Sequence, residues 1–227
     1  MKLLRMVILI LFLTMPVIAN THTPYFFLTT GGVFPHQETI IPRLNKFSVR
    51  TDTNQGLLLG GGIGFKFRDN IKMELEMNHG WMNISDLNTV EMRVLGITIE
   101  GGEGSLNSLS LTANGRYNFP SGRKWTPYIL GGAGAGQISL KDVVIHIAPV
   151  YPDASVEKYP FVDDKTWQFV YQAGFGLTYL VGENFILDLG YRYFAALNPS
   201  FHTLHEEEFK GKLQRSHLLL SLKYRFK

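Results

Sequence analysis

The sequence contains no cysteine among its 227 residues. This absence excludes a disulfide framework, a thiol nucleophile, a cysteine-based zinc site and a lipoprotein anchor. Charge is also scarce, since Asp, Glu, Lys and Arg together make up 18% of the chain. Hydrophobic residues reach 45% and aromatic residues 13%, which excludes an intrinsically disordered chain.

The one long apolar run lies at the N-terminus. Lys2 and Arg5 precede the run Met6–Met15, and a short segment ending at Ala19 follows it. This layout is typical of a secretory signal, which we expect to be cleaved after Ala19. A membrane-spanning helix is the alternative. The run is shorter than the roughly 20 residues that a span needs, and Pro16 interrupts it.

We therefore divide the chain into a signal peptide, residues 1–19, and one mature domain, residues 20–227. Removal of the signal lowers the number of Lys and Arg residues from 22 to 20, against 19 acidic residues. The mature charge is then close to neutral. It gives no argument for a nucleic-acid partner.

In the rest of the chain, apolar residues recur at every second position instead of forming helix-length runs. In Thr166–Leu180, one face carries Trp167, Phe169, Tyr171, Ala173, Phe175, Leu177 and Tyr179. In Ile71–Asn78, the apolar positions alternate with Lys72, Glu74, Glu76 and Asn78. Leu218–Phe226 repeats the pattern. A period of two predicts β-strands.

Eight segments show this pattern: Tyr25–Phe34, Gln55–Phe67, Ile71–Met82, Ser105–Phe119, Pro127–Leu140, Lys165–Leu180, Phe185–Ala195 and Lys212–Phe226. Three connections are short: Arg68–Asn70, Pro120–Lys124 and Val181–Asn184. Four are long and polar: Pro35–Asn54, Asn83–Gly104, Lys141–Asp164 and Ala196–Gly211. This alternation predicts an all-β fold, an eight-stranded antiparallel transmembrane β-barrel of up-and-down meander topology with long extracellular loops.

A soluble β-sandwich or a lipocalin-type barrel is the structural alternative. The polar face of the expected strands, however, holds glycines and ionisable groups instead of small apolar fillers. Aromatic residues also gather at both strand ends. Those near the short turns are Tyr117, Phe119, Trp125, Tyr128, Tyr179, Phe185, Tyr224 and Phe226. Those near the long loops are Trp81, Trp167, Tyr193 and Phe194. Two aromatic belts favour the membrane barrel.

The segments PYILGGAGAG (Pro127–Gly136) and YQAGFGLTYLVGENFILDLGYRYF (Tyr171–Phe194) and the aromatic-ended last strand resemble bacterial outer-membrane β-barrel surface antigens. That family includes small OmpA-transmembrane-like and opacity-type barrels. The resemblance implies the outer membrane of a Gram-negative bacterium. It also implies that the barrel-assembly machinery, helped by periplasmic chaperones, reads Leu222, Tyr224 and Phe226.

An eight-stranded barrel is narrow enough for side chains to fill its interior. Folding the second expected strand onto the third pairs Gly64 with Glu74 and Gly62 with Glu76. Asp188 should lie opposite Gly176 or Thr178. Buried charges persist when they are paired, so we expect a polar network in the lumen. Its expected members are Lys72, Glu74, Glu76, Arg116, Asp188, Arg192, Lys223 and Arg225. We also expect small water pockets beside the inward glycines, namely Gly60, Gly62, Gly64, Gly174 and Gly176.

Sequence motifs for nucleotide binding, metal binding or hydrolysis are weak. The glycine runs at 60–64 and 131–136 precede no helix and no Gly-Lys-Ser/Thr, as a phosphate loop requires. His202–Glu208 lacks the spacing of a known metal site. His217 near Ser221 suggests a hydrolase, but the histidine–serine spacing of the lipid A deacylases is absent. We expect no catalysis, no cofactor and no metal.

The long loops remain as candidates for function. Lys141–Asp164 is rich in valine and isoleucine, and Pro35–Asn54 carries Arg43, Lys46 and Arg50. These loops either bind partners or pack on themselves. The expected partners are outer-membrane lipid, lipopolysaccharide and a host-surface ligand, with a structural, antigen or adhesin-like role. A lipid A-modifying enzyme and a narrow low-conductance channel remain the alternatives.

Overall fold

The structure, a computed structural model, describes residues 24–36, 38–42, 49–89, 98–121, 124–148, 157–197, 200–202, 208–211 and 213–226. The expected signal peptide lies outside these ranges and stays a prediction. All the regular elements in the described ranges are β-strands. No helix within them is long and apolar enough to cross a membrane.

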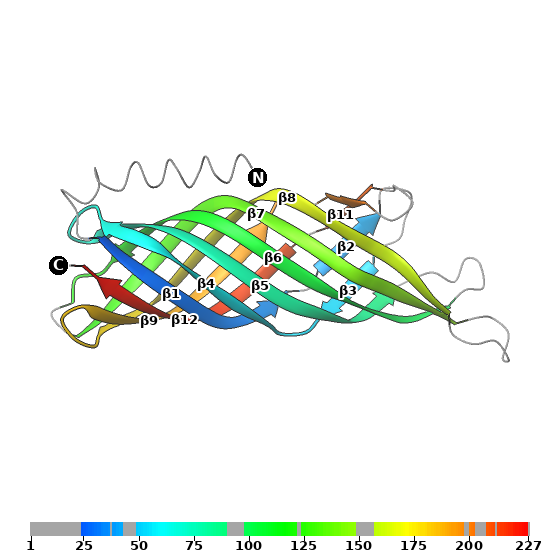
Figure 1. Cartoon of the computed structure of the whole chain (residues 1–227), viewed down its shortest axis with the longest axis horizontal. Coiled ribbons are helices and arrows are strands. Elements are labelled where there is room, and N and C mark those ends of the chain that lie inside the picture. The colour runs from blue at the N-terminus through cyan, green and yellow to red at the C-terminus, as the bar shows by residue number, and fades with distance from the viewer. Residues whose placement is uncertain are drawn as a thin grey trace.

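Eight strands form the wall of a closed barrel. They are β1 (Pro24–Pro35), β4 (Gly56–Lys66), β5 (Ile71–Thr89), β6 (Thr98–Asn118), β7 (Trp125–Ala148), β8 (Glu157–Leu180), β9 (Phe185–Ala196) and β12 (Leu213–Arg225). Each pairs antiparallel with the next of these strands along the chain, and β12 returns to pair with β1 (Figure 1). The predicted eight-stranded meander barrel is confirmed.

Four short strands extend the wall at the end away from the short turns. They are β2 (Glu38–Pro42), β3 (Val49–Thr53), β10 (Ser200–His202) and β11 (Glu208–Gly211). The outer part of β5 pairs with β3, β3 with β2, β2 with β11 and β11 with β10. The segments expected as the first and last long loops therefore contain sheet (Figure 1).

The predicted loop boundaries are also wrong at Asn83–Gly104 and Lys141–Asp164, where most described residues continue the barrel wall. Strands β7 and β8 each run for 24 residues, and their pairing extends to Ile147 and Glu157. A membrane-spanning strand needs about 9–11 residues, so the wall rises well beyond the bilayer. The β-branched run that begins at Val143 explains the extension, because such residues favour strands.

The two faces of the strands alternate as predicted. On β12, Leu218, Leu220 and Leu222 are 46–50% exposed on the outer face, whereas Leu219 and Lys223 between them are buried. Successive side chains of a strand point to opposite faces. The apolar outer face is therefore available to lipid, and the other face fills the barrel.

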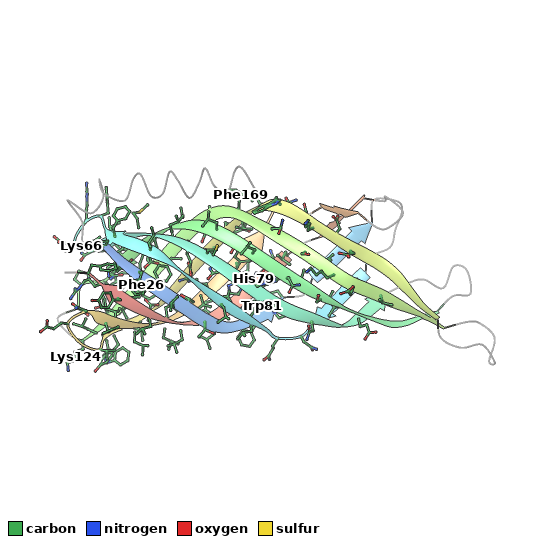
Figure 2. All side chains as sticks on the ribbon, viewed as in Figure 1. Phe26, Lys66, His79, Trp81, Lys124 and Phe169 are labelled. Carbon is green, nitrogen blue, oxygen red and sulfur yellow. The ribbon has the colours of Figure 1, made fainter. Side chains whose placement is uncertain are left out.

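Most exposed aromatic side chains lie at two levels of the outer face, and Phe175 and Tyr191 lie between these levels. The exposed ones near the short turns are Tyr117, Phe119, Trp125, Phe185 and Phe226, and those farther along are Trp81, Trp167, Phe169 and Tyr171. In Figure 2, Lys66 and Lys124 lie at the short-turn end, whereas Trp81 and Phe169 lie near the middle of the molecule. Strands β5 and β8 continue beyond the level of Trp81 and Phe169, away from the short turns.

Two members of the predicted belts do not belong to them. Tyr128 and Phe194 are only 2% and 4% exposed, and both lie inside the barrel. The Tyr128 hydroxyl donates a hydrogen bond to Asp188, and the Phe194 ring stacks on His217. Buried tyrosine hydroxyls need a partner, which the lumen supplies and lipid does not.

Lys66, the last residue of β4, has inward parity but lies at the barrel rim, next to the β4–β5 turn. Its Nζ lies 2.8 Å from Oδ1 of Asp69, whose side chain is almost fully exposed, while that of Lys66 is 44% exposed. The hydrogen bond and the positive charge of Lys66 hold the pKa of Asp69 below its ordinary value. An ion pair this exposed contributes little to stability.

Candidate functional site

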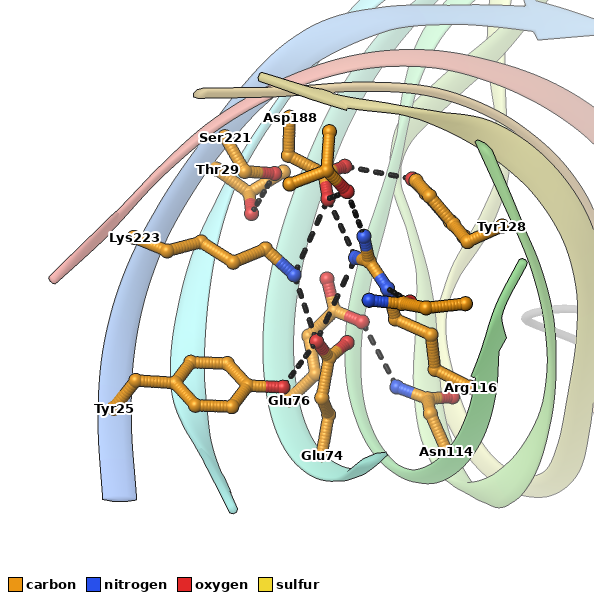
Figure 3. A network of polar contacts seen from close by, with 12 residues as sticks. Tyr25, Thr29, Glu74, Glu76, Asn114, Arg116, Tyr128, Asp188, Ser221 and Lys223 are labelled. Atoms are coloured by element: carbon orange, nitrogen blue, oxygen red, sulfur yellow. Dashed lines mark hydrogen bonds and ion pairs between the residues drawn. The ribbon is translucent and has the colours of Figure 1, made fainter. Parts of the chain in front are cut away.

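The inward faces of the strands bring together a polar network in the half of the barrel near the short turns. Figure 3 shows its side chains converging from several strands. Glu74 and Glu76 come from β5, Arg116 from β6, Asp188 from β9 and Lys223 from β12. All five are at most 3% exposed.

Glu74 accepts two hydrogen bonds on the same oxygen. The Tyr25 hydroxyl and the Lys223 ammonium each donate to its Oε1 at 2.7 Å. Nη1 of Arg116 lies 3.7 Å from that oxygen. Glu74 thus joins β5 to β1, β6 and β12 across the lumen.

Asp188 is the second centre of the network. The Tyr128 hydroxyl donates to its Oδ1 at 2.6 Å, and Arg116 donates to its Oδ2 at 2.5 Å. Lys223 Nζ lies 3.4 Å from Oδ2. The Arg116 guanidinium also lies over the Tyr128 ring, 3.4 Å from its centroid, where the ring face attracts a cation.

Glu76 forms the third centre, one step farther from the short turns. Its Oε2 accepts hydrogen bonds from Arg192, from Asn114 at 3.0 Å and from Gln172 at 3.4 Å. Gln172 also donates to Oδ1 of Asn114 at 2.7 Å. Three carboxylates therefore face three cations. The other oxygens of Glu74 and Glu76 accept no hydrogen bond from a described residue.

The strand register explains how these groups meet. Gly64 lies opposite Glu74, Gly62 lies opposite Glu76, and Thr178 lies opposite Asp188, as the sequence predicts. The expected water pockets beside the inward glycines are wrong, because side chains occupy those spaces. A Cβ built on each of these glycines would lie within 3 Å of a neighbouring side-chain atom, from Asn78 at Gly60, Phe27 at Gly62, Tyr25 at Gly64, Arg192 at Gly174 and Tyr128 at Gly176.

Gly64→Val is expected to lower the free energy of unfolding by about 1–3 kcal/mol, as overpacked interiors do. The added Cβ alone would lie 2.4 Å from the Tyr25 ring. Gly131→Val is the matched control, since nothing lies within 4 Å of a Cβ at the exposed Gly131. Urea unfolding in lipid vesicles measures both changes. Equal losses would contradict the assigned role of Gly64.

Two expected members of the network do not join it. Lys72 lies at its edge, with Nζ 5.5 Å from the Tyr25 ring centroid, and forms no ion pair with a described residue. Arg225 has inward parity but lies past the barrel rim, where it is exposed and donates a hydrogen bond to the Glu183 carbonyl. Because the barrel ends at this residue, the Arg225 side chain lies in solvent and not in the lumen.

The structure also adds residues that the sequence argument missed. Tyr25, Tyr128 and Asn114 complete the network, and Arg215 is buried two positions above His217 on the inward face of β12. Strand parity alone would have found Arg215. Tyr128 was missed because aromatic side chains near strand ends are usually assigned to the membrane interface.

Above the polar network, the half of the lumen toward the long hairpins is mostly apolar, although Arg215 and His217 of β12 are buried there as well. Its buried cluster comprises Val33, Leu58, Met82, Ile84, Leu106, Ile138, Leu140, Val143, Val170, Phe194, Ala196, Leu213 and Leu219. The expectation that the inner face lacks apolar fillers is therefore wrong for this half. The interior consists of an ionic layer and a second layer that is mostly hydrophobic.

The other candidate sites are not assembled. The His217 ring stacks on Phe194, while Ser221 shares a hydrogen bond with the Thr29 hydroxyl at 2.8 Å, so no His217–Ser221 pair exists. Among the described residues, no group of three or more His, Asp or Glu side chains is placed to hold a metal ion. The segment expected as a histidine-rich cluster is described only at its ends, His202 and Glu208.

With the geometry established, comparison with known proteins identifies the family. The sequence model of the outer membrane protein β-barrel domain matches residues 38–226. The chain belongs to this family. No curated protein matches it.

One of three similar solved structures shares the fold of this chain at a TM-score above 0.5, and the two others are similar at lower scores. OprG from Pseudomonas aeruginosa has a TM-score of 0.51 at 15% identity, over 90% of this chain and 97% of that chain. Neisserial surface protein A gives 0.43 at 12% identity, over 88% and 97%. Ail, the attachment invasion locus protein of Yersinia pestis, gives 0.36 at 16% identity, over 90% and 99%. The protein is localised in the outer membrane of a Gram-negative bacterium.

Proposed function

We propose that this barrel is a closed, non-conducting outer-membrane protein whose role is structural and surface-exposed, as an antigen or adhesin. The observation that carries the proposal is the filled lumen. Three carboxylates and three cations meet in one layer, and a buried apolar cluster fills the next. A wide aqueous channel needs about 16 strands, twice the number here.

The extended wall supports the surface-exposed part of the proposal. Strands β7 and β8 continue far beyond a membrane-spanning length, and β2, β3, β10 and β11 add further sheet at the same end. Extensions of this kind are not needed to close a barrel. They suit a surface that meets other molecules, as functional loops do. Lipopolysaccharide and a host-surface ligand are the partners that we propose.

We also propose that the assembly machinery and periplasmic chaperones read the end of β12. Leu222 and Phe226 are 48% and 45% exposed on the outer face. Tyr224 lies between them in sequence and contacts Phe26 and Phe185 with its ring. Before β12 closes on β1, this apolar and aromatic edge is available to a partner.

Protease treatment of intact cells tests the surface role. A cleavage site introduced at residues 149–156, between β7 and β8, should be cut, and cutting should reduce binding of the bacteria to host cells at least several-fold. The control site, in the Arg68–Asn70 turn, should be cut only after the outer membrane is permeabilised. Unchanged host-cell binding after complete cleavage would contradict a role for this hairpin in adhesion, and recovery of soluble periplasmic protein would contradict the barrel's location.

A further inference from the structure

A second polar cluster lies on the outer wall of the barrel. Ser216 of β12 is opposite Phe34 of β1 and Tyr193 of β9. It has the same strand parity as Leu218 and Leu220, which are half exposed on the lipid-facing side. Ser216 therefore faces outward, although the side chains around it leave it only 6% exposed.

The hydroxyl of Ser216 lies between a phenol and an imidazole. Tyr191 Oη is 2.6 Å from Ser216 Oγ, and His36 Nε2 is 3.3 Å from the same oxygen. Both hydrogen bonds are satisfied when the Tyr191 hydroxyl donates to Oγ and the serine hydroxyl donates to Nε2 of His36. His36 is exposed, and its ring centroid lies 5.9 Å from that of Tyr193. A serine within reach of a histidine base is the arrangement of an activated nucleophile.

The height of the cluster places it at the outer edge of the bilayer. Ser216 is ten residues from Phe226 along β12. At about 3.3 Å per residue, and with a tilt near 40°, the separation along the membrane normal is about 25 Å. This matches the apolar band of a barrel, about 25 Å tall. Ser216 thus lies at the level of the headgroups and acyl esters of the outer leaflet.

We propose that Ser216, His36 and Tyr191 form a hydrolytic site for the acyl esters of outer-leaflet lipids. Ser216 Oγ attacks the ester carbonyl carbon while His36 Nε2 takes the serine proton, and the Tyr191 hydroxyl donates a hydrogen bond to the oxyanion. The ester C–O bond breaks, and His36 returns the proton to the leaving alkoxide. Water, deprotonated by His36, then attacks the acyl-serine. The bond from the acyl carbon to Ser216 Oγ breaks, His36 returns the proton to Oγ, and a fatty acid is released.

The positions of Ser216, His36 and Tyr191 favour a catalytic role over a purely structural one. A serine that only had to satisfy its hydroxyl would need one partner, as Ser221 has in Thr29 inside the lumen. Ser216 has both a base and a donor, contributed by three neighbouring strand segments at the level where lipid esters lie. Phospholipids and lipopolysaccharide share this ester chemistry.

The experiment uses the full-length mature barrel in two kinds of vesicle, phosphatidylethanolamine with phosphatidylglycerol, and the same lipids with lipopolysaccharide. Mass spectrometry measures released fatty acid, and a fluorophosphonate probe followed by peptide mapping locates the reactive serine. We expect release in at least one vesicle type and one adduct, on Ser216. The vesicle that supports release identifies the lipid source.

Single substitutions test the separate roles of Ser216, His36 and Tyr191. Ser216→Ala should reduce release to the protein-free level and abolish the adduct, and His36→Gln should lower the rate by about 10²–10⁴-fold. Tyr191→Phe should lower it by about 10²–10³-fold. The control, Ser139→Ala, removes an outward serine that has no hydrogen bond to a histidine among the described residues, and should leave release unchanged. Release by Ser216→Ala at the wild-type rate, or no release from either vesicle by the wild type, would overturn the proposal. Heat-modifiable gel mobility verifies that every variant is folded.

Discussion

Glu76→Ala is expected to lower the free energy of unfolding of the barrel by about 3–5 kcal/mol, which is the usual loss when one partner of a buried ion pair is removed. The carboxylate of Glu76 accepts hydrogen bonds from Arg192, Asn114 and Gln172. Its removal leaves the Arg192 guanidinium, only 3% exposed, without its ion-pair partner. Urea unfolding of the protein in lipid vesicles measures the loss.

Two control variants test whether the loss of stability comes from the buried charge of Glu76. Glu76→Gln keeps the volume of the side chain and removes its charge, so its loss should be smaller than that of Glu76→Ala. Asp69→Ala removes the exposed ion pair with Lys66 and should leave the unfolding curve unchanged, because solvent screens that pair. If Glu76→Ala unfolds at the wild-type urea concentration, the network does not hold the strands together.

The sequence predicts most of the barrel because alternation in a strand directly reports which face is buried. The same alternation places Glu74, Glu76 and Asp188 in the lumen, and the short β4–β5 turn sets the register that pairs Gly64 with Glu74. These relationships involve residues close together in the sequence. They need no knowledge of the strands across the barrel.

Contacts between distant segments could not be predicted in the same way. His36 and Ser216 are 180 positions apart and meet because β1 and β12 pair to close the barrel. Tyr128 reaches Asp188 because Gly176 and Gly190 leave room for its ring. Such contacts depend on the strand pairing that closes the barrel and on packing inside the lumen, and alternation reports neither.

The prediction of the loop boundaries was wrong for a related reason. A strand that extends beyond the bilayer pairs its backbone with neighbouring strands as a membrane strand does, but its side chains need not follow the apolar alternation. The β-branched run from Val143 pairs with β6 on one side and with the outer part of β8 on the other. A membrane strand is recognised by the apolar residues that face lipid, and a strand beyond the bilayer does not need such residues.

Planar-bilayer recordings of the wild-type barrel are expected to show no large, steady conductance, because the ionic and apolar layers close the lumen in series. Glu74→Ala combined with Glu76→Ala disrupts the ionic layer and leaves Lys223 and Arg192 without a principal partner. The apolar layer should still prevent steady ion flow, since a hydrophobic constriction excludes water. The double variant should therefore be less stable but remain closed.

Openings should appear when the apolar layer is altered as well. Adding Val170→Ser and Leu219→Ser to the double variant places hydroxyls in the second layer, where both native side chains are at most 2% exposed. Brief, low-conductance openings are expected from this quadruple variant, and Val170→Ser with Leu219→Ser alone serves as the control, with the ionic layer intact and the current absent. A large, steady current from the wild-type monomer would instead show that the lumen conducts, and the protein would then function as a channel.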